Sequence, residues 1–193
     1  MLSRRPRLPR RRNSRASRMP PSLTPSYEVI AFGAHPDDLE AVMGGTAVKL
    51  ARSGLSVLFV DLCEGEPARH AARGERHKQA AQAAKILGVD RVTLPLQDRL
   101  IRDTVEARLD VARLLRLHRP RMVFATSGAG VHPDHQALTQ IVINGVFYAR
   151  LPKWDGVPGG ELLRDTPPHE IQRLFSAIAG WSPLGTGSIS PSV

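Results

Sequence analysis

The stretch YEVIAFGAHPDD, residues 27–38, decides the fold of this chain. Its first seven residues are almost continuously apolar and end at Gly33, which is the pattern of a strand buried on both faces. A polar turn, His35-Pro36-Asp37-Asp38, follows at once, and from about Ala41 to Arg52 the apolar residues recur with a helical period. A buried strand that leads through a short turn into a helix indicates the start of a βαβ unit.

The same alternation repeats along the chain. Strand-like runs cover residues 55–62 (LSVLFVDL), 91–96 and 121–126, and helical periods cover about 74–87, 103–118 and 135–148. Gly88 is a typical helix stop, and Asp103 with Glu106 predicts a capping box at the start of the helix over 103–118. Strands that alternate with helices through short links predict an α/β, Rossmann-like fold of three layers with a mostly parallel sheet.

We expect three parts in the chain. Residues 1–26 form a basic N-terminal tail that we predict to be disordered, residues 27–178 form the α/β domain, and residues 179–193 form an irregular C-terminal tail. Past Leu151 the periodicity weakens, although PPHEIQRLF, residues 167–175, is compatible with one more strand.

The formal net charge of +9 originates in the tail. Eight of the 27 basic residues are arginines within residues 1–18, where there is no acidic residue, so the remaining chain nearly balances its 18 acidic residues. A basic arm can bind nucleic acid by charge neutralisation, but here no aromatic residue stands between the arginines to stack on bases. We therefore favour a disordered leader, or translation upstream of Met19, and keep a nucleic-acid-associated protein as the alternative.

Composition also bears on the compartment. The single cysteine, Cys63, cannot form an internal disulfide, and no apolar run approaches the roughly 20 residues of a membrane span. We expect a soluble, cytoplasmic protein without a membrane span. The start is rich in Arg and Ser and free of acid, so an organelle transit peptide remains open.

Two polar clusters follow predicted strands, His35-Pro36-Asp37-Asp38 and His132-Pro133-Asp134-His135. Two histidines and a carboxylate around an open position are a common catalytic zinc set, and a neighbouring carboxylate can serve as general base. Either cluster alone also fits an ordinary helix start or a solvated surface. Because ligands in such folds bind beyond the carboxyl ends of the strands, the two clusters together predict a metal site.

The quoted residues resemble a known family. AHPDDLE at 34–40, MGGT at 43–46 and HPDH at 132–135 are similar to the PIG-L/LmbE-like zinc-dependent N-acetylglucosaminyl deacetylases, which include enzymes of the mycothiol and bacillithiol pathways. The likeness runs from about Val29 to Tyr148. It implies a metal-dependent amidohydrolase that removes the acetyl group from a small-molecule N-acetylglucosamine conjugate. The implied cofactor is Zn²⁺, or another divalent metal such as Fe²⁺, and relatives of this kind often form homo-oligomers.

The resemblance assigns roles position by position. The implied metal ligands are His35, Asp38 and His135. Asp37 would be the general base, protonated His132 would stabilise the oxyanion, and Asp134 would orient His132. The implied substrate contacts are Arg76, Asp98 and Glu66.

This chain departs from the family pattern in two places. Relatives usually continue through a further strand and helix, whereas the recognisable pattern here ends near Phe175, so the C-terminal part looks truncated. A weakly active or inactive metal-binding homologue is therefore a second alternative. Some relatives also carry a tyrosine two residues before the first histidine of the second cluster, where this chain has Gly130.

Overall fold

The computed structural model describes residues 26–66, 72, 74–127 and 132–178. The predicted tails (apart from Ser26) and Gly130 lie outside these residues, so what we expect of them stays a prediction. The described elements, in chain order, are β1 (Val29–Gly33), α1 (Asp38–Arg52), β2 (Val57–Cys63), α2 (Glu75–Leu87), β3 (Asp90–Leu96), α3 (Val105–His118), β4 (Met122–Ser127), α4 (Pro133–Arg150), the short 3-10 helix η2 (Gly160–Leu162) and β5 (Arg173–Ile178).

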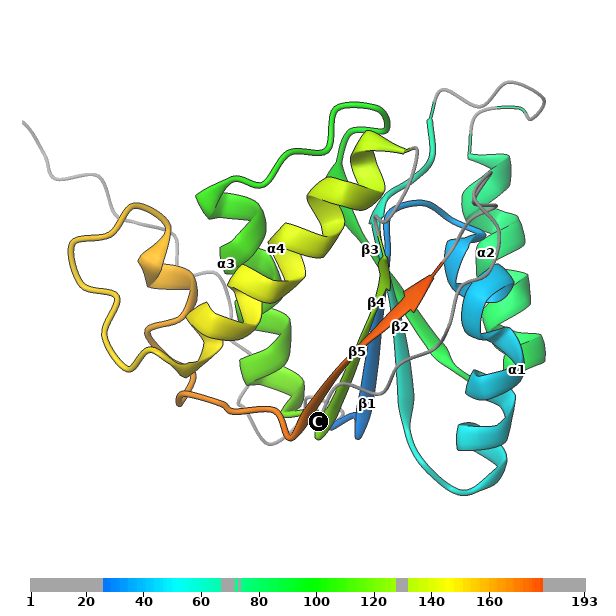
Figure 1. Cartoon of the computed structure of the whole chain (residues 1–193), viewed down its shortest axis with the longest axis horizontal. Helices are drawn as coiled ribbons and strands as arrows, with labels where there is room; N and C mark the ends of the chain where they lie inside the picture. The colour runs from blue at the N-terminus through cyan, green and yellow to red at the C-terminus, as the bar shows by residue number, and fades with distance from the viewer. Residues whose placement is uncertain (1–25, 67–71, 73, 128–131, 179–193) are drawn as a thin grey trace, which may run out of the picture.

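The five strands form one sheet in the order β3-β2-β1-β4-β5, and each neighbouring pair is parallel. Helices cover both faces (Figure 1), with α1 and α2 on one side and α3 and α4 on the other. The predicted three-layer α/β fold with a parallel sheet is confirmed. The strand-like pattern at 167–175 contributes the start of β5.

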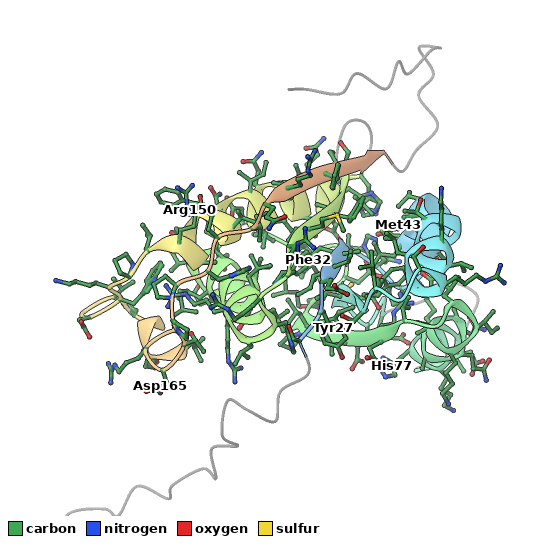
Figure 2. The ribbon with its side chains drawn as sticks, turned by 90° about the horizontal axis from the view of Figure 1, so that it is seen from below. Tyr27, Phe32, Met43, His77, Arg150 and Asp165 are labelled. Carbon is green, nitrogen blue, oxygen red and sulfur yellow. The ribbon has the colours of Figure 1, made fainter. Side chains whose placement is uncertain are left out.

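The apolar run that opens the fold contributes to both cores. Every residue of β1 is buried. Val29 and Ala31 pack into the core beneath α1 and α2, whereas Ile30 and Phe32 pack into the core beneath α3 and α4. Figure 2 shows Phe32 within the sheet and Met43 on α1. A central parallel strand with helices on both faces needs apolar side chains at every position, which explains why β1 shows no polar alternation.

The start of α3 differs from the prediction. The cap is Thr104, whose Oγ1 accepts the N–H of Ala107 at 3.3 Å. The carboxylate of Asp103 instead accepts two bonds from the guanidinium of Arg108, both at 2.6 Å. The predicted cap at Asp103 is therefore wrong, because the side chain of Asp103 is already bound in an ion pair with Arg108.

The chain changes direction along the sheet after β3. β1, β2 and β3 progress toward one edge, and β4 then pairs with the opposite side of β1. As a result, α1 follows β1 onto one face while α4 follows β4 onto the other (Figure 1). Open α/β sheets bind ligands at such a switch point, beyond the carboxyl ends of the strands. Both histidine clusters lie at this point.

None of the described helices is long and apolar enough to cross a membrane.

Candidate metal site

The turn after β1 is closed by the residues that it presents. The N–H of His35 donates to Oδ2 of Asp38 at 2.9 Å, and the N–H of Asp38 donates to the carbonyl of His35 at 3.3 Å. Asp38 is also the first residue of α1, where the helix dipole favours a negative charge. These bonds fix the Asp38 carboxylate at the carboxyl edge of the sheet.

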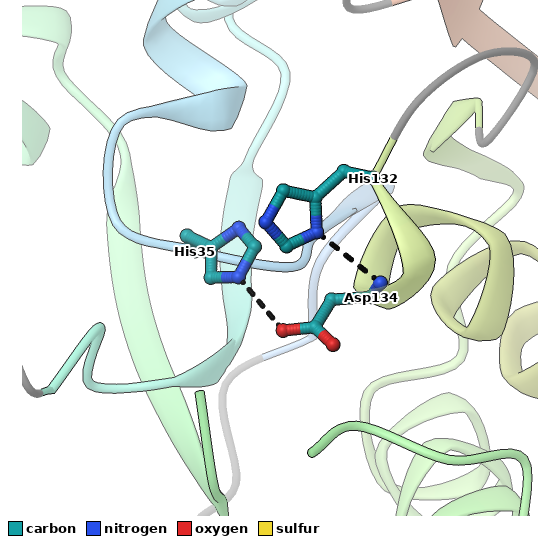
Figure 3. A group of neighbouring side chains, drawn as sticks. All are labelled: His35, His132 and Asp134. Atoms are coloured by element: carbon teal, nitrogen blue, oxygen red, sulfur yellow. Dashed lines mark hydrogen bonds and ion pairs between the residues drawn. The ribbon is translucent and has the colours of Figure 1, made fainter. Parts of the chain in front are cut away.

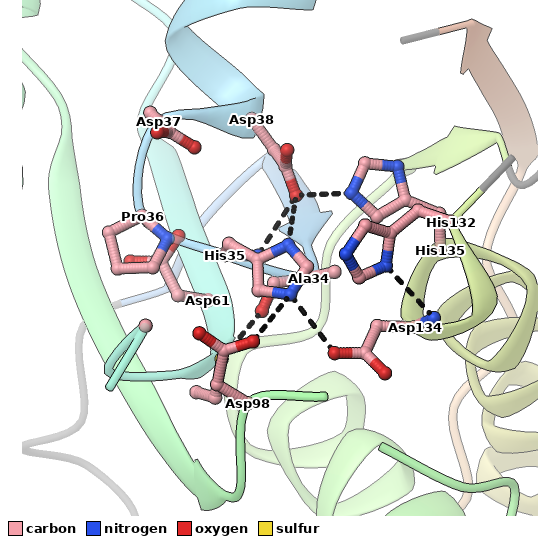
Figure 4. A network of polar contacts seen from close by, with 12 residues as sticks. Ala34, His35, Pro36, Asp37, Asp38, Asp61, Asp98, His132, Asp134 and His135 are labelled. Carbon is pink, nitrogen blue, oxygen red and sulfur yellow. Dashed lines mark hydrogen bonds and ion pairs between the residues drawn. The ribbon is translucent and has the colours of Figure 1, made fainter. Parts of the chain in front are cut away.

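The second cluster forms the start of α4. His132 caps the helix, because its Nδ1 accepts the N–H of Asp134 at 3.2 Å. Pro133 takes the first helical position, where a missing N–H costs nothing. His135 then lies in the first turn of the helix and faces Asp38 (Figure 4).

The structure brings the three expected ligands together. His35, Asp38 and His135 each offer one donor atom, and these atoms lie within 4.8 Å of one another. Oδ2 of Asp38 lies 3.1 Å from Nε2 of His135 and 3.5 Å from Nδ1 of His35 (Figure 4). Two imidazoles and a carboxylate that face one another across this distance are a donor set that suits zinc.

The other ring nitrogen of His35 faces two carboxylates. Its Nε2 lies 3.0 Å from Oδ2 of Asp134 and 3.4 Å from Oδ1 of Asp98 (Figure 4). A histidine that binds a metal usually donates its remaining N–H to a carboxylate, which fixes the tautomer and the ring orientation. A proton on Nε2 would leave Nδ1, the atom next to Asp38, free to act as a ligand.

The carboxylate of Asp134 forms a hydrogen bond with the ring of His35. The resemblance predicts that this side chain orients His132, but its carboxylate accepts from His35 and from the N–H of Arg99, the latter at 2.7 Å. Contact with His132 is made by the backbone N–H of Asp134 (Figure 3). His35, His132 and Asp134 also bring donor atoms within 4.8 Å, but His132 is exposed. An exposed side chain is better placed to contact a substrate than to enclose an ion.

Negative charge is concentrated around the three expected ligands. Asp98 and Asp134 are only 8% and 1% exposed. Burial alone would raise the pKa of Asp38, but hydrogen bonds from His135 and His35 hold it well below its usual range. Burial would lower the pKa of His35, but its bonds with Asp38 and Asp134 raise it instead. Carboxylates enclosed so close together need a compensating cation, so these residues fit a divalent metal.

Asp37, the expected general base, lies beside this set in an unusual conformation. Its φ of 121° falls in a region that residues other than glycine rarely adopt. Its side chain is 72% exposed and its Oδ2 accepts from Nη2 of Arg76 at 3.0 Å. A pocket of about 170 Å³ opens here, and its lining residues are Pro36, Asp37, Glu40, Arg76, Gln79, Ala80 and Ala83.

The three residues expected to contact substrate have different surroundings. Nη1 of Arg76 lies 4.0 Å from Oδ2 of Asp98, and Asp98 in turn faces His35, so both lie next to the expected metal ligands. Glu66 lies in the loop after β2, and its Oε1 accepts the N–H of Gly74, the residue before α2, at 2.7 Å. Their roles toward a substrate stay predictions.

A cluster of ion pairs next to the site, formed by Arg91, Asp61 and Glu40, is not among the residues predicted from the sequence. Arg91 of β3 donates to Asp61 of β2 through Nε at 2.6 Å and Nη2 at 2.7 Å, and it also donates to Glu40 of α1. Asp61 is fully buried and the Arg91 side chain is 6% exposed. A sequence signal does exist, because an aspartate inside the buried run LSVLFVDL requires a charged or hydrogen-bonding partner.

The fold and the site together define a class, an α/β protein with a His/Asp metal-type site at the switch point of a parallel sheet. Within that class, the chain belongs to the PIG-L family, described as GlcNAc-PI de-N-acetylase, whose model matches residues 30–146. This match confirms the resemblance seen in the two histidine clusters.

Individual relatives agree with the family assignment. Diacetylchitobiose deacetylase of Thermococcus kodakarensis is 30% identical over 158 residues, which cover 76% of this chain and 58% of that protein. The crystal structure of a conserved protein from Thermus thermophilus is 34% identical with a TM-score of 0.71, covering 81% of this chain and 68% of that one. N,N'-diacetylchitobiose deacetylase from Pyrococcus horikoshii is 28% identical with a TM-score of 0.65, covering 74% and 56%. The chain thus spans little more than half the length of the two named deacetylases.

Proposed function

We propose that the chain carries a metal-dependent hydrolase site that removes the acetyl group from an N-acetylglucosamine-containing conjugate. The observation that carries the proposal is the convergence of His35, Asp38 and His135 in a chain of the de-N-acetylase family. Two relatives are named for diacetylchitobiose, an N-acetylated sugar, which supports a substrate of the same chemical class.

His35, Asp38 and His135 would hold the ion, for which the donor set favours zinc. When bound, zinc would supply the Lewis acidity that polarises an amide carbonyl and makes water a stronger acid. The protein's own part is to fix the ligands. Asp134 and Asp98 turn Nε2 of His35 toward themselves, and the turn after β1 holds the carboxylate of Asp38.

Asp37 would carry the proton. Its carboxylate removes a proton from the attacking water while the water oxygen bonds to the carbonyl carbon of the acetamide. The carbon–nitrogen bond then breaks as the same carboxyl group returns the proton to the departing nitrogen. The products are acetate and a free amino sugar. An amine leaves readily only after it is protonated. One carboxyl group can serve both steps, because the proton that it takes from water is the proton that it gives to the nitrogen.

His132 would stabilise the negative charge on the carbonyl oxygen. Its Nδ1 accepts the N–H of Asp134, so this nitrogen carries no proton. The proton of the ring therefore lies on Nε2, which can donate a hydrogen bond to the oxygen as charge develops there. This geometry supports Nε2 as the nitrogen through which His132 donates.

The test combines metal analysis with acetate release from a panel of N-acetylglucosamine glycosides. We expect release by the full chain, with a loss of about 100-fold or more in Asp37→Ala although the metal is retained. His135→Ala should lose the metal itself. Metal binding without turnover of any acetylated sugar would overturn the hydrolase proposal in favour of a metal-binding homologue.

The alternative of nucleic-acid binding concerns residues 1–18, outside the part of the chain that the structure describes. It requires binding that weakens steeply with salt and disappears when translation starts at Met19. Equal binding with and without those residues would dismiss it.

A further inference from the structure

The guanidinium of Arg76 links two loops at the carboxyl edge of the sheet. Nη1 donates to the carbonyl of Gly65 at 3.1 Å, in the loop that follows β2. Nη2 donates to the carbonyl of Pro36 at 2.9 Å and to Oδ2 of Asp37 at 3.0 Å, in the turn that follows β1. Since Nη2 carries only two hydrogens, the turn after β1 uses both of them.

That turn holds Asp37 in its unfavourable backbone conformation. A residue with a φ of 121° keeps it only when neighbouring contacts impose it. On the far side of Asp37, its carbonyl accepts the N–H of Ala41 at 3.0 Å within the first turn of α1. On the near side, the carbonyl of Pro36 is held by Arg76. The two bonds fix the peptide groups on both sides of Asp37, and the third contact fixes its carboxylate.

Gly65 shows how closely Arg76 is packed against this turn. Its φ is 73°, and a Cβ atom added at this position would lie 2.6 Å from Nη1 of Arg76 and 3.0 Å from Cδ of Pro36. Any side chain at position 65 would therefore push the guanidinium away. Glycine at this position allows Arg76 to reach both loops.

We infer that Arg76 is a positioning residue for Asp37, which holds the strained Pro36–Asp37 turn in the conformation that catalysis needs. The inference rests on the proposed function for the role of Asp37, and it differs from the substrate contact that the family resemblance assigns to Arg76. A positioning residue acts on the chemical step, so its loss lowers kcat, whereas the loss of a uniform substrate contact raises KM.

The first experiment measures kcat and KM for acetate release by the metal-loaded chain. Arg76→Met keeps most of the side-chain volume and removes the donors, and we expect kcat to fall about 100-fold with KM within about threefold of wild type. Gly65→Ala leaves the cation in the protein but displaces it, and kcat should fall in the same direction. Lys78→Met removes an exposed cation two residues further along α2 and serves as the matched control, with kinetics close to wild type.

The second experiment does not require turnover. Amide hydrogen exchange across residues 35–41 should be faster in Arg76→Met and in Gly65→Ala than in wild type, and unchanged in Lys78→Met. A wild-type chain that lacks deacetylase activity would overturn the proposed function, while the exchange data would still decide whether Arg76 holds the turn. Unchanged exchange in both variants, or a raised KM with kcat preserved, would overturn the positioning role.

Discussion

Nε2 of His35 lies 3.0 Å from Oδ2 of Asp134, although 99 positions separate the two residues in the sequence. The bond joins the turn after β1 to the first turn of α4, and it sets which nitrogen of His35 is available to a metal. Asp134 also accepts the N–H of Arg99, so the loop after β3 helps to hold the carboxylate in place. Three loops thus depend on one buried side chain.

Asp134→Asn should therefore weaken metal binding. An amide is a poorer acceptor for the N–H of His35, and loss of such a partner typically lowers metal affinity about 10- to 100-fold. Competition with a chromophoric chelator measures the change, and Asp155→Asn, at an exposed loop position, is the control. Unchanged affinity combined with slower turnover would show that Asp134 acts chiefly through His132.

Arg91 should contribute to stability far more than an exposed arginine does. Its removal leaves Asp61 as an unpaired carboxylate in the core, and burial raises the pKa of Asp61 even with Arg91 present. We expect Arg91→Met to cost about 3–5 kcal/mol in the free energy of unfolding, measured by urea denaturation.

The double variant of Arg91→Met with Asp61→Leu separates pairing from packing. It should recover part of that loss, because no charge then remains without a partner between β2 and β3. A double variant as unstable as the sum of the two single changes would contradict this explanation.

The strands and helices of this chain can be predicted from the sequence, because the apolar pattern and the residues at the ends of each segment indicate the same elements. LSVLFVDL is apolar at nearly every position, and β2 is buried at every position. Gly88 is a typical helix stop, and it ends α2 with a left-handed φ of 73°. Parallel pairing of the strands then places the two histidine clusters at one edge of the sheet, so their proximity can be predicted from the strands alone.

Side-chain partners are harder to predict, because they depend on loops without a pattern. Asp103 and Thr104 are both good helix caps, and the choice between them is made by Arg108 and Asn144, which bind the Asp103 carboxylate at 2.6 and 3.0 Å. Likewise, the partner of Asp134 is set partly by the turn at Arg99, whose φ of 66° no sequence period indicates.

Alkaline pH should weaken the fold through Tyr27. Burial, together with the hydrogen bond to Asp90 at 2.8 Å, raises the pKa of this phenol to about 12 from an ordinary value of 10.0. The folded state therefore keeps a proton that the unfolded chain releases above pH 10. The stabilisation is complete below pH 10 and is lost as the pH rises toward 12.

The stability difference between wild type and Tyr27→Phe should accordingly narrow between pH 10 and pH 12 in urea denaturation. The chain has two tyrosines, so absorbance at 295 nm in a Tyr148→Phe background follows the ionisation of Tyr27 alone. A midpoint near pH 10 in that titration would contradict the raised pKa.

Removal of the metal should lower the melting temperature of the chain. Asp38, Asp98 and Asp134 lie close together around the imidazoles of His35 and His135, and a bound cation would offset the negative charge that they share. A ligand at about 100 times its dissociation constant stabilises the folded state by about 2.7 kcal/mol, which corresponds to roughly 5–10 °C for a domain of this size. Calorimetry with excess zinc and with EDTA measures the shift, and His135→Ala should abolish it because one of the three proposed ligands is gone. A shift that persists in His135→Ala would place the stabilising ion at other residues.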